Sequence, residues 1–591
     1  MGVTCDSVRA GAAALLALAL LTAPPAAAAA PDIETASAPA ALAAPDAANP
    51  APAAVEAPAA APTSAPAPDN AAAPAVDPEM AAALTVALDA LVAGDGKADP
   101  IGEGDWRAAC LSIRAFYAGR GYAPIWLDGK ALSAHARAAL ARLGRAGEDA
   151  LDLSAFALPT ELPADATPQR LAEADVTLSA AVVAYAMQAS GARVVPTRIS
   201  RLIAAKPEVA DPGAALAALA AAADPDGALQ AYNPPQKGYR DLRDQLARIR
   251  AARPAEPTPP PTAAAAAAGI PSGPSLGLGM RDPRVPLVRA RLGLAAVDGA
   301  AAEVYDLPVA AAVQTFQRDH GLPPNGALTP ATAAALSGGV TAPALAPKSA
   351  STASLARRAA MIVANLEMWR WQPRDMGAER IEINIPEFAL RLMDGDDLVH
   401  QARVIVGKPD TPTPIFSNEM KYILVNPIWR VPDSIVRKEF APRLAEDPDY
   451  LVRRGYRVAE IGGRLVVSQP PGEGNALGHI LFMFPNEFSV YLHDTPLRGL
   501  FGAGRRAFSH GCVRLDQPMR LAELVMGSGW GARLQAMIGS TQRTVMLPRK
   551  IPIHLEYFTE FVDASGALQE REDIYGVAGR VAGTLSKISQ D

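Results

Sequence analysis

The sequence predicts a multidomain α+β protein whose helical regions precede a β-rich region. The 591 residues are enough for several domains. Two segments rich in Ala and Pro, residues 31–78 and 253–276, cannot bury a core and are interpreted as linkers. Apolar residues recur at helical spacing in much of the chain up to Trp369, whereas strand-like alternation dominates after it.

Residues 1–30 have the pattern of a secretory signal peptide. Arg9 precedes an apolar run at 12–21, and the small residues at 28–30 suit cleavage. The run is short for a membrane span, and an uncleaved anchor is the alternative interpretation. We therefore expect a secreted protein, with a membrane tether only if this segment is retained. The linker at 31–78 would let the folded part stand away from a membrane or reach into a wall.

Composition limits both the partners and the redox chemistry. The net charge is −6, and the chain has neither a basic run nor interleaved aromatic and basic residues. A nucleic-acid partner is therefore not expected. Of the three cysteines, Cys5 lies in the signal segment, so cleavage would leave Cys110 and Cys512. These two could pair in an oxidising compartment.

Residues 79–252 predict a helical domain. Helical spacing marks segments 79–91, 106–117, 134–143 and 177–190, and the last of these ends near Gly191. Between the second and third, Arg120–Trp126 forms a compact aromatic turn. Residues 233–250 begin as an extended entry and continue as a charged helix. On these patterns alone, a helical domain without a site of its own is the simpler interpretation.

Residues 277–339 predict a small unit of three helices. The first is expected over 284–292, the second over 310–320 with Val313 and Phe316 on one face, and the third from Thr332. A turn at Asn325-Gly326 separates the last two. His320 stands at a helix end, where a histidine is more often a cap than a metal ligand, so no metal site is expected.

Residues 351–580 predict one helix followed by a sheet. The helix covers 355–371, and late residues such as His554 sit among apolar neighbours and are interpreted as structural. The excursion at 432–463 is charged and is expected to be helical, with a solvated surface loop as the alternative. Strands are expected at 380–385, 388–393, 404–407, 422–429, 465–467, 480–484, 489–493, 544–547 and 551–557.

The residues that can carry chemistry gather at Tyr491-Leu-His493-Asp494 and Ser509-His510-Gly511-Cys512-Val513-Arg514. A thiolate is a strong nucleophile, and a nearby imidazole can take the thiol proton. His510 is close in sequence, but a short turn rarely aims a ring at a side chain two residues on. His493 lies nineteen residues before Cys512, and alternation places it on the same strand face as Tyr491. A cysteine beside a histidine is by itself more often part of a core than a catalyst.

The spacing of His493-Asp494-x-Pro and Ser509-His-Gly-Cys-Val-Arg514 resembles the L,D-transpeptidase (YkuD-type) catalytic domain. Many members have Asn where this chain has Arg514, and the large multidomain branch often has Arg. Tyr122-Ala-Pro-Ile-Trp126 with its following helices resembles the scaffold domain of that branch. The run Val313–Leu322 with Asn325-Gly326 resembles the three-helix peptidoglycan-binding domain. Asp573-Ile-Tyr-Gly576 resembles the terminal signature of the large branch.

This resemblance implies a β-rich catalytic domain whose cleft is capped by the insertion at 432–463. It implies a two-step acyl transfer between peptidoglycan stem peptides, without metal or organic cofactor. Cys512 would be the nucleophile and His493 its base, oriented by the backbone carbonyl of Asp494. Backbone N–H groups near Gly511 and Cys512 would hold the oxyanion. The residues implied to line the donor site are Tyr491, Ser509, His510, Arg514 and Trp429.

The resemblance also implies a periplasmic, wall-associated enzyme, in which Cys110 and Cys512 stay free because pairing would consume the nucleophile. Three alternatives remain open at this point. The same acyl-enzyme could be resolved by water, which makes an L,D-carboxypeptidase, or by a protein amine, which attaches the wall to a protein. A wall-binding scaffold with an idle catalytic domain is disfavoured by the intact Cys512 and His493. Protein partners and oligomeric state do not follow from the sequence.

Overall fold

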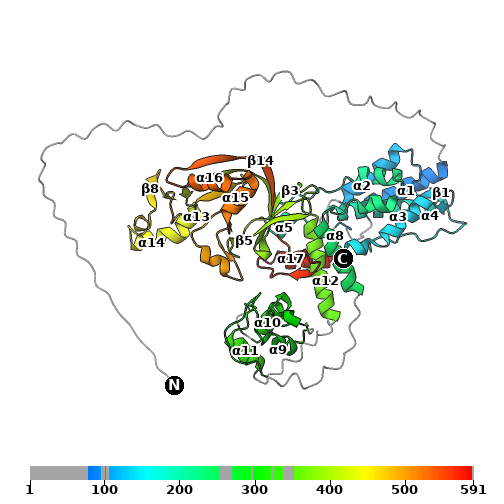
Figure 1. Ribbon diagram of the computed structural model, residues 1–591. Helices are drawn as coiled ribbons and strands as arrows, with labels where there is room; N and C mark the ends of the chain where they lie inside the picture. Colours follow the sequence, from blue (N-terminus) through cyan, green and yellow to red (C-terminus); the bar gives the residue numbers. More distant parts are fainter. Residues whose placement is uncertain are drawn as a thin grey trace, which may run out of the picture. The chain divides into compact units, whose positions relative to one another are not determined.

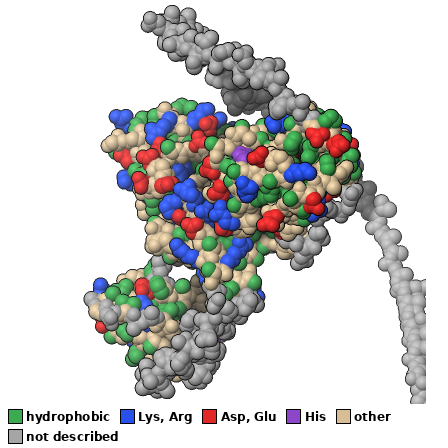
Figure 2. Space-filling model, turned by 90° about the vertical axis from the view of Figure 1, so that its right-hand side faces the viewer, with side chains coloured by type: hydrophobic (Ala, Val, Ile, Leu, Met, Phe, Trp, Pro, Cys, Tyr) green, Lys and Arg blue, Asp and Glu red, His purple; other side chains and the backbone are tan. Residues whose placement is uncertain are grey.

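The computed structural model describes residues 77–94, 100–101, 106–251, 269–294, 297, 299–320, 322, 325–337 and 352–588 (Figure 1). The expected signal peptide lies outside the described residues, as do nearly all of the first linker and most of the second. In the described part, no helix has the length and apolar character needed to cross a membrane. Figure 2 shows acidic and basic side chains interspersed over one face, with Lys and Arg most numerous near its middle.

The N-terminal helical region is built around α4 (Pro168–Ala189). Every side chain of α4 from Leu178 onward is buried, so the helix is enclosed by its neighbours on all sides. Thr167 caps its start, and the helix begins nine residues before the predicted segment at 177–190. The helices packed against α4 are α1 (Pro78–Ala93), α2 (Trp106–Gly119), α3 (Ala134–Leu143), α6 (Pro212–Ala221) and α7 (Pro225–Gln230). The region also contains α5 (Pro196–Ile199) and α8 (Lys237–Ala251).

The predicted aromatic turn is tied to α4 by one buried carboxylate. Asp175 accepts hydrogen bonds from the backbone N–H groups of Ile125 and Trp126, at 3.1 and 2.7 Å. The hydroxyl of Tyr117 donates to the same carboxylate at 2.5 Å, and the Trp126 indole N–H donates to Ser179 Oγ at 2.8 Å. Burial raises the pKa of Asp175 to about 6, against the opposing effect of these donors. The turn therefore has a structural role in this domain.

The small unit has the three predicted helices, α9 (Val285–Arg291), α10 (Leu307–Asp319) and α11 (Pro330–Ser337). Val313 and Phe316 lie in its core, as their shared helix face predicts. The buried amide of Gln317 fixes the turn after α10, because its Oε1 accepts from the N–H of Gly326 and its Nε2 donates to Ala327 O. Nδ1 of His320 lies 2.9 Å from the carbonyl oxygen of Phe316, and the two rings stack.

The C-terminal region contains a nine-stranded sheet in the order β12-β5-β13-β11-β10-β6-β14-β3-β4. Because β4 also pairs with β5, the sheet closes on itself and β12 remains outside the ring. Helices α12 (Thr352–Trp369), α15 (Pro518–Met526), α16 (Trp530–Ala536) and α17 (Val577–Ile588) accompany it (Figure 1). The strands are β3 (Glu379–Asn384), β4 (Ala389–Asp394), β5 (Asp397–Gly407), β6 (Phe416–Val425), β10 (Ile480–Met483), β11 (Leu492–His493), β12 (Ala507–Ser509), β13 (Val513–Leu515) and β14 (Arg543–Glu556).

The insertion is only partly helical, so the prediction of a helical segment over 432–463 is wrong for its second half. Short helical turns fill 433–454, but β8 (Arg457–Ile461) and β9 (Arg464–Gln469) form a hairpin. Gly462 and Gly463, both at positive φ, make its two-residue turn. The expectation of a helix came from the charged residues of this segment, which are exposed in the hairpin.

Two neighbouring strand predictions also need correction. The expected strand at 422–429 is interrupted at Asn426, whose φ of 55° breaks the extended backbone. Its end becomes β7 (Trp429–Arg430), which pairs with β9 in the separate three-stranded sheet β7-β9-β8. The strand at 465–467 belongs to this small sheet rather than to the main one. The insertion has its own hydrophobic cluster, which includes Val436, Leu451 and Val467.

The last scaffold helix packs into the core of the C-terminal region. Tyr239 and Leu242 of α8 share one buried cluster with the sheet. Arg370 donates to the carbonyl oxygen of Asp149 at 2.6 Å and to the hydroxyl of Tyr239 at 2.9 Å. Its ion pair with Glu367, at 3.1 Å, has no exposed side-chain surface. A helix that the sequence places at the end of one domain therefore stabilises the next.

Candidate active site

Two adjacent parallel strands place the predicted chemical residues on one side of the sheet. Strand β11 pairs with β13 in the register Leu492–Val513 and His493–Arg514. Residues directly opposite each other share a face, and side chains two apart along a strand share it too. Cys512 directly precedes β13, and the N–H of Val513 donates to the carbonyl oxygen of Tyr491 at 2.9 Å. Tyr491, His493, Cys512 and Arg514 therefore gather at the ends of these two strands.

His493 is buried and held in one orientation. The residue is 4% exposed, and its Nδ1 lies 2.6 Å from the backbone carbonyl oxygen of Asp494. A carbonyl can only accept, so Nδ1 carries the hydrogen and Nε2 is the unprotonated nitrogen of the neutral ring. Burial, followed by the positive charge of Arg514, lowers the pKa of His493 to about 4, against the carbonyls of Asp494 and Leu477. At neutral pH the ring is an uncharged base.

Asp494 orients this histidine through its backbone and not through its carboxylate. The carboxylate is buried and accepts from the N–H of His479 at 2.9 Å and from Arg498 at 2.7 Å. Gly478 stands directly against it, because a Cβ at that position would lie 2.4 Å from the Asp494 carboxyl group. The side chain thus fixes the loop that presents the carbonyl oxygen to His493.

The turn before the cysteine is braced from both sides. Ser509 Oγ accepts from the N–H of Gly511 at 3.1 Å and donates to the carbonyl oxygen of Cys512 at 2.5 Å. The carbonyl oxygen of Gly511 accepts from Thr413 Oγ1 at 2.8 Å. Gly511 has a φ of +114°, which a residue with a side chain rarely adopts. Tyr575 supports Thr413 in turn, because its hydroxyl accepts from the Thr413 N–H at 3.2 Å.

These bonds bear on two roles that the resemblance implied. Ser509 is buried, and its hydroxyl is used within the turn, so a contact between Ser509 and a donor stem stays a prediction. The N–H of Gly511 is already bonded to Ser509 Oγ, and the N–H of Cys512 is a candidate backbone donor that this turn can offer to an oxyanion. The turn therefore presents the thiol and one N–H together.

The thiol of Cys512 is half-buried at the surface of this turn. Its Sγ lies 3.9 Å from the carbonyl oxygen of Ser489, a residue with a φ of +54°. Burial raises the pKa of the thiol, while the N–H of Tyr491 and the charge of Arg514 act in the opposite direction. The structure shows no disulfide between Cys512 and Cys110, which is buried in α2.

His510 and Trp429 contact the insertion. Nε2 of His510 lies 2.6 Å from Oε1 of Glu439, which is on the short helical turn at 436–440. The ring of Trp429 lies 6.2 Å from the ring of Tyr456. His510 is therefore directed at the insertion, in agreement with the expectation that its ring does not turn towards Cys512 two residues on. Its contact joins the insertion to the cysteine turn.

Sequence reasoning missed several residues that shape the site. Thr413 carried a weak signal, because its Thr-Pro-Thr-Pro segment follows a predicted strand. Ser489 and Glu439 carried none, because a positive φ and a long-range contact have no local sequence pattern. In the described part of the chain, no group of three or more His, Cys, Asp or Glu side chains could hold a metal ion.

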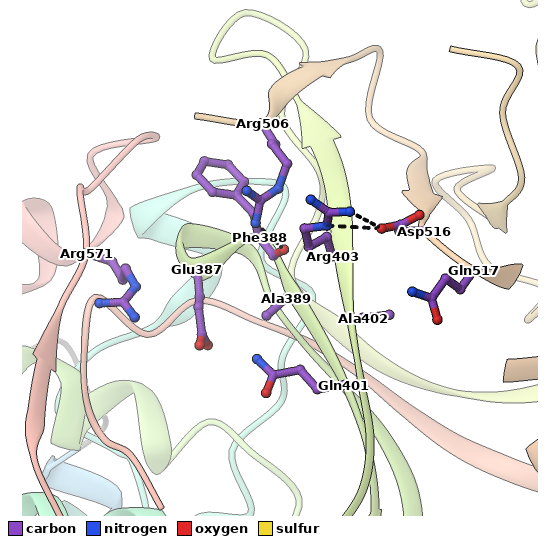
Figure 3. A pocket seen from close by; sticks show the side chains of 10 residues that line it. All are labelled: Glu387, Phe388, Ala389, Gln401, Ala402, Arg403, Arg506, Asp516, Gln517 and Arg571. Atoms are coloured by element: carbon purple, nitrogen blue, oxygen red, sulfur yellow. Dashed lines mark hydrogen bonds and ion pairs between the residues drawn. The ribbon is translucent and has the colours of Figure 1, made fainter. Parts of the chain in front are cut away.

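Two cavities lie away from Cys512. The first, of about 450 Å³, is lined by residues of β4, β5 and the segments that flank β12 and β13 (Figure 3). Its Arg403 is paired with Asp516, and Arg506 donates to the carbonyl oxygen of Phe388. The second, of about 660 Å³, lies where residues 197–208 meet Phe416 and Phe488. Neither cavity includes His493 or Cys512 among its lining residues.

Three segments of the chain match known domain families. Residues 378–545 match the L,D-transpeptidase catalytic domain, residues 112–246 the "Scaffold domain", and residues 282–336 the "Putative peptidoglycan binding domain". A Haemophilus influenzae protein described as "Putative L,D-transpeptidase" is 30% identical over 231 residues, which are 36% of this chain. The match covers 46% of that protein, so it spans less than half of the relative's length.

Solved structures of similar proteins have low sequence identity and low TM-scores. An L,D-transpeptidase from Mycobacterium smegmatis is 15% identical, over 30% of this chain and 58% of that one, with a TM-score of 0.17. An L,D-transpeptidase (residues 123–326) from Xylanimonas cellulosilytica is 16% identical, over 48% of this chain and 98% of that one, with a TM-score of 0.18. Such scores do not establish a shared architecture. Residues 378–545 are thus similar to the L,D-transpeptidase catalytic domain family, and other segments of the same chain match the scaffold and peptidoglycan-binding domain families.

Proposed function

We propose that this protein is a peptidoglycan L,D-transpeptidase that forms 3-3 cross-links by cysteine acyl transfer. The observation that carries the proposal is that Cys512 directly precedes β13 while His493 lies on the adjacent strand β11, both within the matched catalytic domain. The peptidoglycan-binding and scaffold matches support peptidoglycan as the substrate. They also support an extracytoplasmic location, which we take to be the periplasm.

In the first step, Cys512 Sγ attacks the carbonyl carbon between the third residue of a tetrapeptide stem and the terminal D-alanine. Nε2 of His493 takes the thiol proton as the C–S bond forms, and the N–H of Cys512 donates to the oxyanion. The tetrahedral intermediate collapses when the C–N bond breaks. The His493 imidazolium passes its proton to the leaving amine of D-alanine. The product is a thioester between Cys512 and the tripeptide stem.

In the second step, an amine on the third residue of a neighbouring stem attacks the thioester carbonyl. His493 removes a proton from this amine, and the proton goes to the sulfur when the C–S bond breaks. The result is a new amide between two third residues and a regenerated thiol. The residues present are sufficient for this chemistry with a neutral histidine and a cysteine, so no step requires a cofactor.

The experiment that tests this function is product analysis on purified disaccharide-tetrapeptides. Transfer to a second stem yields 3-3 cross-linked dimers, whereas transfer to water yields disaccharide-tripeptides only. Adding a protein amine donor distinguishes attachment of the wall to a protein. We expect dimers to be the main product. Tripeptides alone would assign the site to a carboxypeptidase.

We further propose that residues 277–339 bind peptidoglycan, because this unit matches a peptidoglycan-binding family and contributes none of the acyl-transfer residues. Deleting it should reduce sedimentation with purified sacculi more than it reduces turnover of soluble stems. Pull-down and turnover should be measured on the same preparation. Replacing the unit by a flexible linker of equal length is the matched control for spacing. Unchanged sedimentation after deletion would reject the wall-binding role.

A further inference from the structure

Arg514 has an unusual position for a positively charged side chain. It lies directly opposite His493 across the β11–β13 pair, so these two side chains share one face of the sheet, and Cys512 directly precedes the same strand. On its other flank, β13 pairs with β5 through Ile405, which is buried and uncharged. The residue opposite Arg514 on β5 therefore offers it no counter-charge.

No carboxylate compensates this charge. Among the described residues, Arg514 forms no ion pair, and its buried Nε has no hydrogen-bond partner. Burial lowers the pKa of the Arg514 guanidinium, and the sulfur of Cys512, once ionised, acts in the opposite direction. A partly buried cation without a counter-charge is costly, so the fold retains a destabilising group at this point. A negative charge that arises on a facing group would remove that cost.

The groups near Cys512 indicate that this negative charge is the Cys512 thiolate. Tyr491, directly before β11, and His493, on β11, are both uncharged at neutral pH. Arg514 is the one fixed cation that acts on both Cys512 and His493. The positive charge of Arg514 lowers the pKa of both groups. It therefore favours the charged form of Cys512, the thiolate, and disfavours the charged form of His493, the imidazolium. A thiolate beside a neutral imidazole is thus balanced by Arg514.

We propose that the guanidinium of Arg514 is the counter-ion of the Cys512 thiolate, in place of a protonated His493. This inference rests on the proposed role of Cys512 as nucleophile. It assigns separate tasks to the two basic groups. Arg514 sets how much thiolate exists before substrate arrives, and His493 moves protons only during acyl transfer. Arg514 is then a positioning residue that acts through the sulfur.

The test measures the thiolate without any peptidoglycan substrate, so its outcome does not depend on the proposed transpeptidase activity. The rate of Cys512 alkylation by iodoacetamide is recorded against pH for the parental full chain, R514M and R514K, each in a C110A background. An opposite charge at close range shifts a pKa by about 1 to 3 units, so R514M should alkylate at least about ten-fold more slowly near pH 7.5. The alkylation midpoint of R514M should move upward, and R514K should restore most of the parental profile.

A parental alkylation profile in R514M would overturn the proposal. If R514M also showed a raised KM for stem peptides, Arg514 would instead bind a substrate carboxylate. Circular dichroism establishes whether R514M is folded. If R514M does not fold, the alkylation profile of H493A decides between the two counter-ions. A His493 imidazolium as counter-ion predicts that the alkylation midpoint moves to a much higher pH when His493 is removed. The counter-ion role of Arg514 predicts a midpoint that stays close to the parental one.

Discussion

Replacing Cys512 by Ala removes cross-link formation entirely, because the sulfur forms the covalent intermediate. The fold should remain intact, since the contact of Sγ with the Ser489 carbonyl oxygen is long, at 3.9 Å, and the bonds of the turn come from Ser509 and Thr413. The expected change in unfolding free energy is within about 1 kcal/mol. Muropeptide chromatography and thermal unfolding on the same sample measure both effects.

The matched control is C110A. Cys110 is buried in α2 among the helices of the N-terminal region, and it belongs to no part of the proposed chemistry. Its replacement should leave dimer formation nearly unchanged, whatever it does to the stability of that region. Normal turnover by C512A would show that the mechanism proposed here is wrong.

Replacing His493 by Ala slows acylation of Cys512 by a carbapenem, a strained β-lactam that reports on attack without an acceptor. The loss of general-base assistance should lower the rate by about 10² to 10⁴. Intact-mass spectrometry should show one adduct per parental chain, located on Cys512. Because the pKa of His493 is lowered to about 4, the parental enzyme should keep acylating through pH 5 to 6 and lose activity only as the pH falls towards 4. At high pH the rate should rise, because burial raises the pKa of the Cys512 thiol and a higher pH increases the share of thiolate.

H510A is the control for this experiment. His510 is 2.6 Å from Glu439 and would have to leave that contact to reach the sulfur, so its loss should have a small effect on acylation. A parental acylation rate in H493A across neutral pH would show that another group activates Cys512. A large loss in H510A at the same time would identify that group.

The core of the candidate site could be predicted from the sequence because its signals are local. The predicted strand at 489–493 is wrong in its first part, because β11 covers only Leu492–His493 and Ser489 has a φ of +54°. Its end does carry His493, and the residues from Ser509 onward form a turn that leads into β13. The helices of the small unit were equally clear, because one apolar face repeats at helical spacing. These features depend on residues that are close together in the chain.

What the sequence could not show depends on contacts between distant residues. The pairing of His510 with Glu439 spans 71 positions, and the packing of α8 against the sheet core joins two regions that a linker and a separate unit divide. The occupied N–H of Gly511 required the position of the Ser509 hydroxyl, which no residue pattern fixes. The hairpin at 457–469 was obscured because its strands are charged and largely exposed.

The central claim is that Cys512 transfers a tripeptide stem to a neighbouring stem. The most direct test follows disaccharide-tetrapeptides over time and compares released D-alanine with the dimers formed, using C512A as the blank. The account predicts that each 3-3 dimer appears with the release of one D-alanine and that C512A produces neither. D-alanine released without dimers, or dimers formed by C512A, would contradict it.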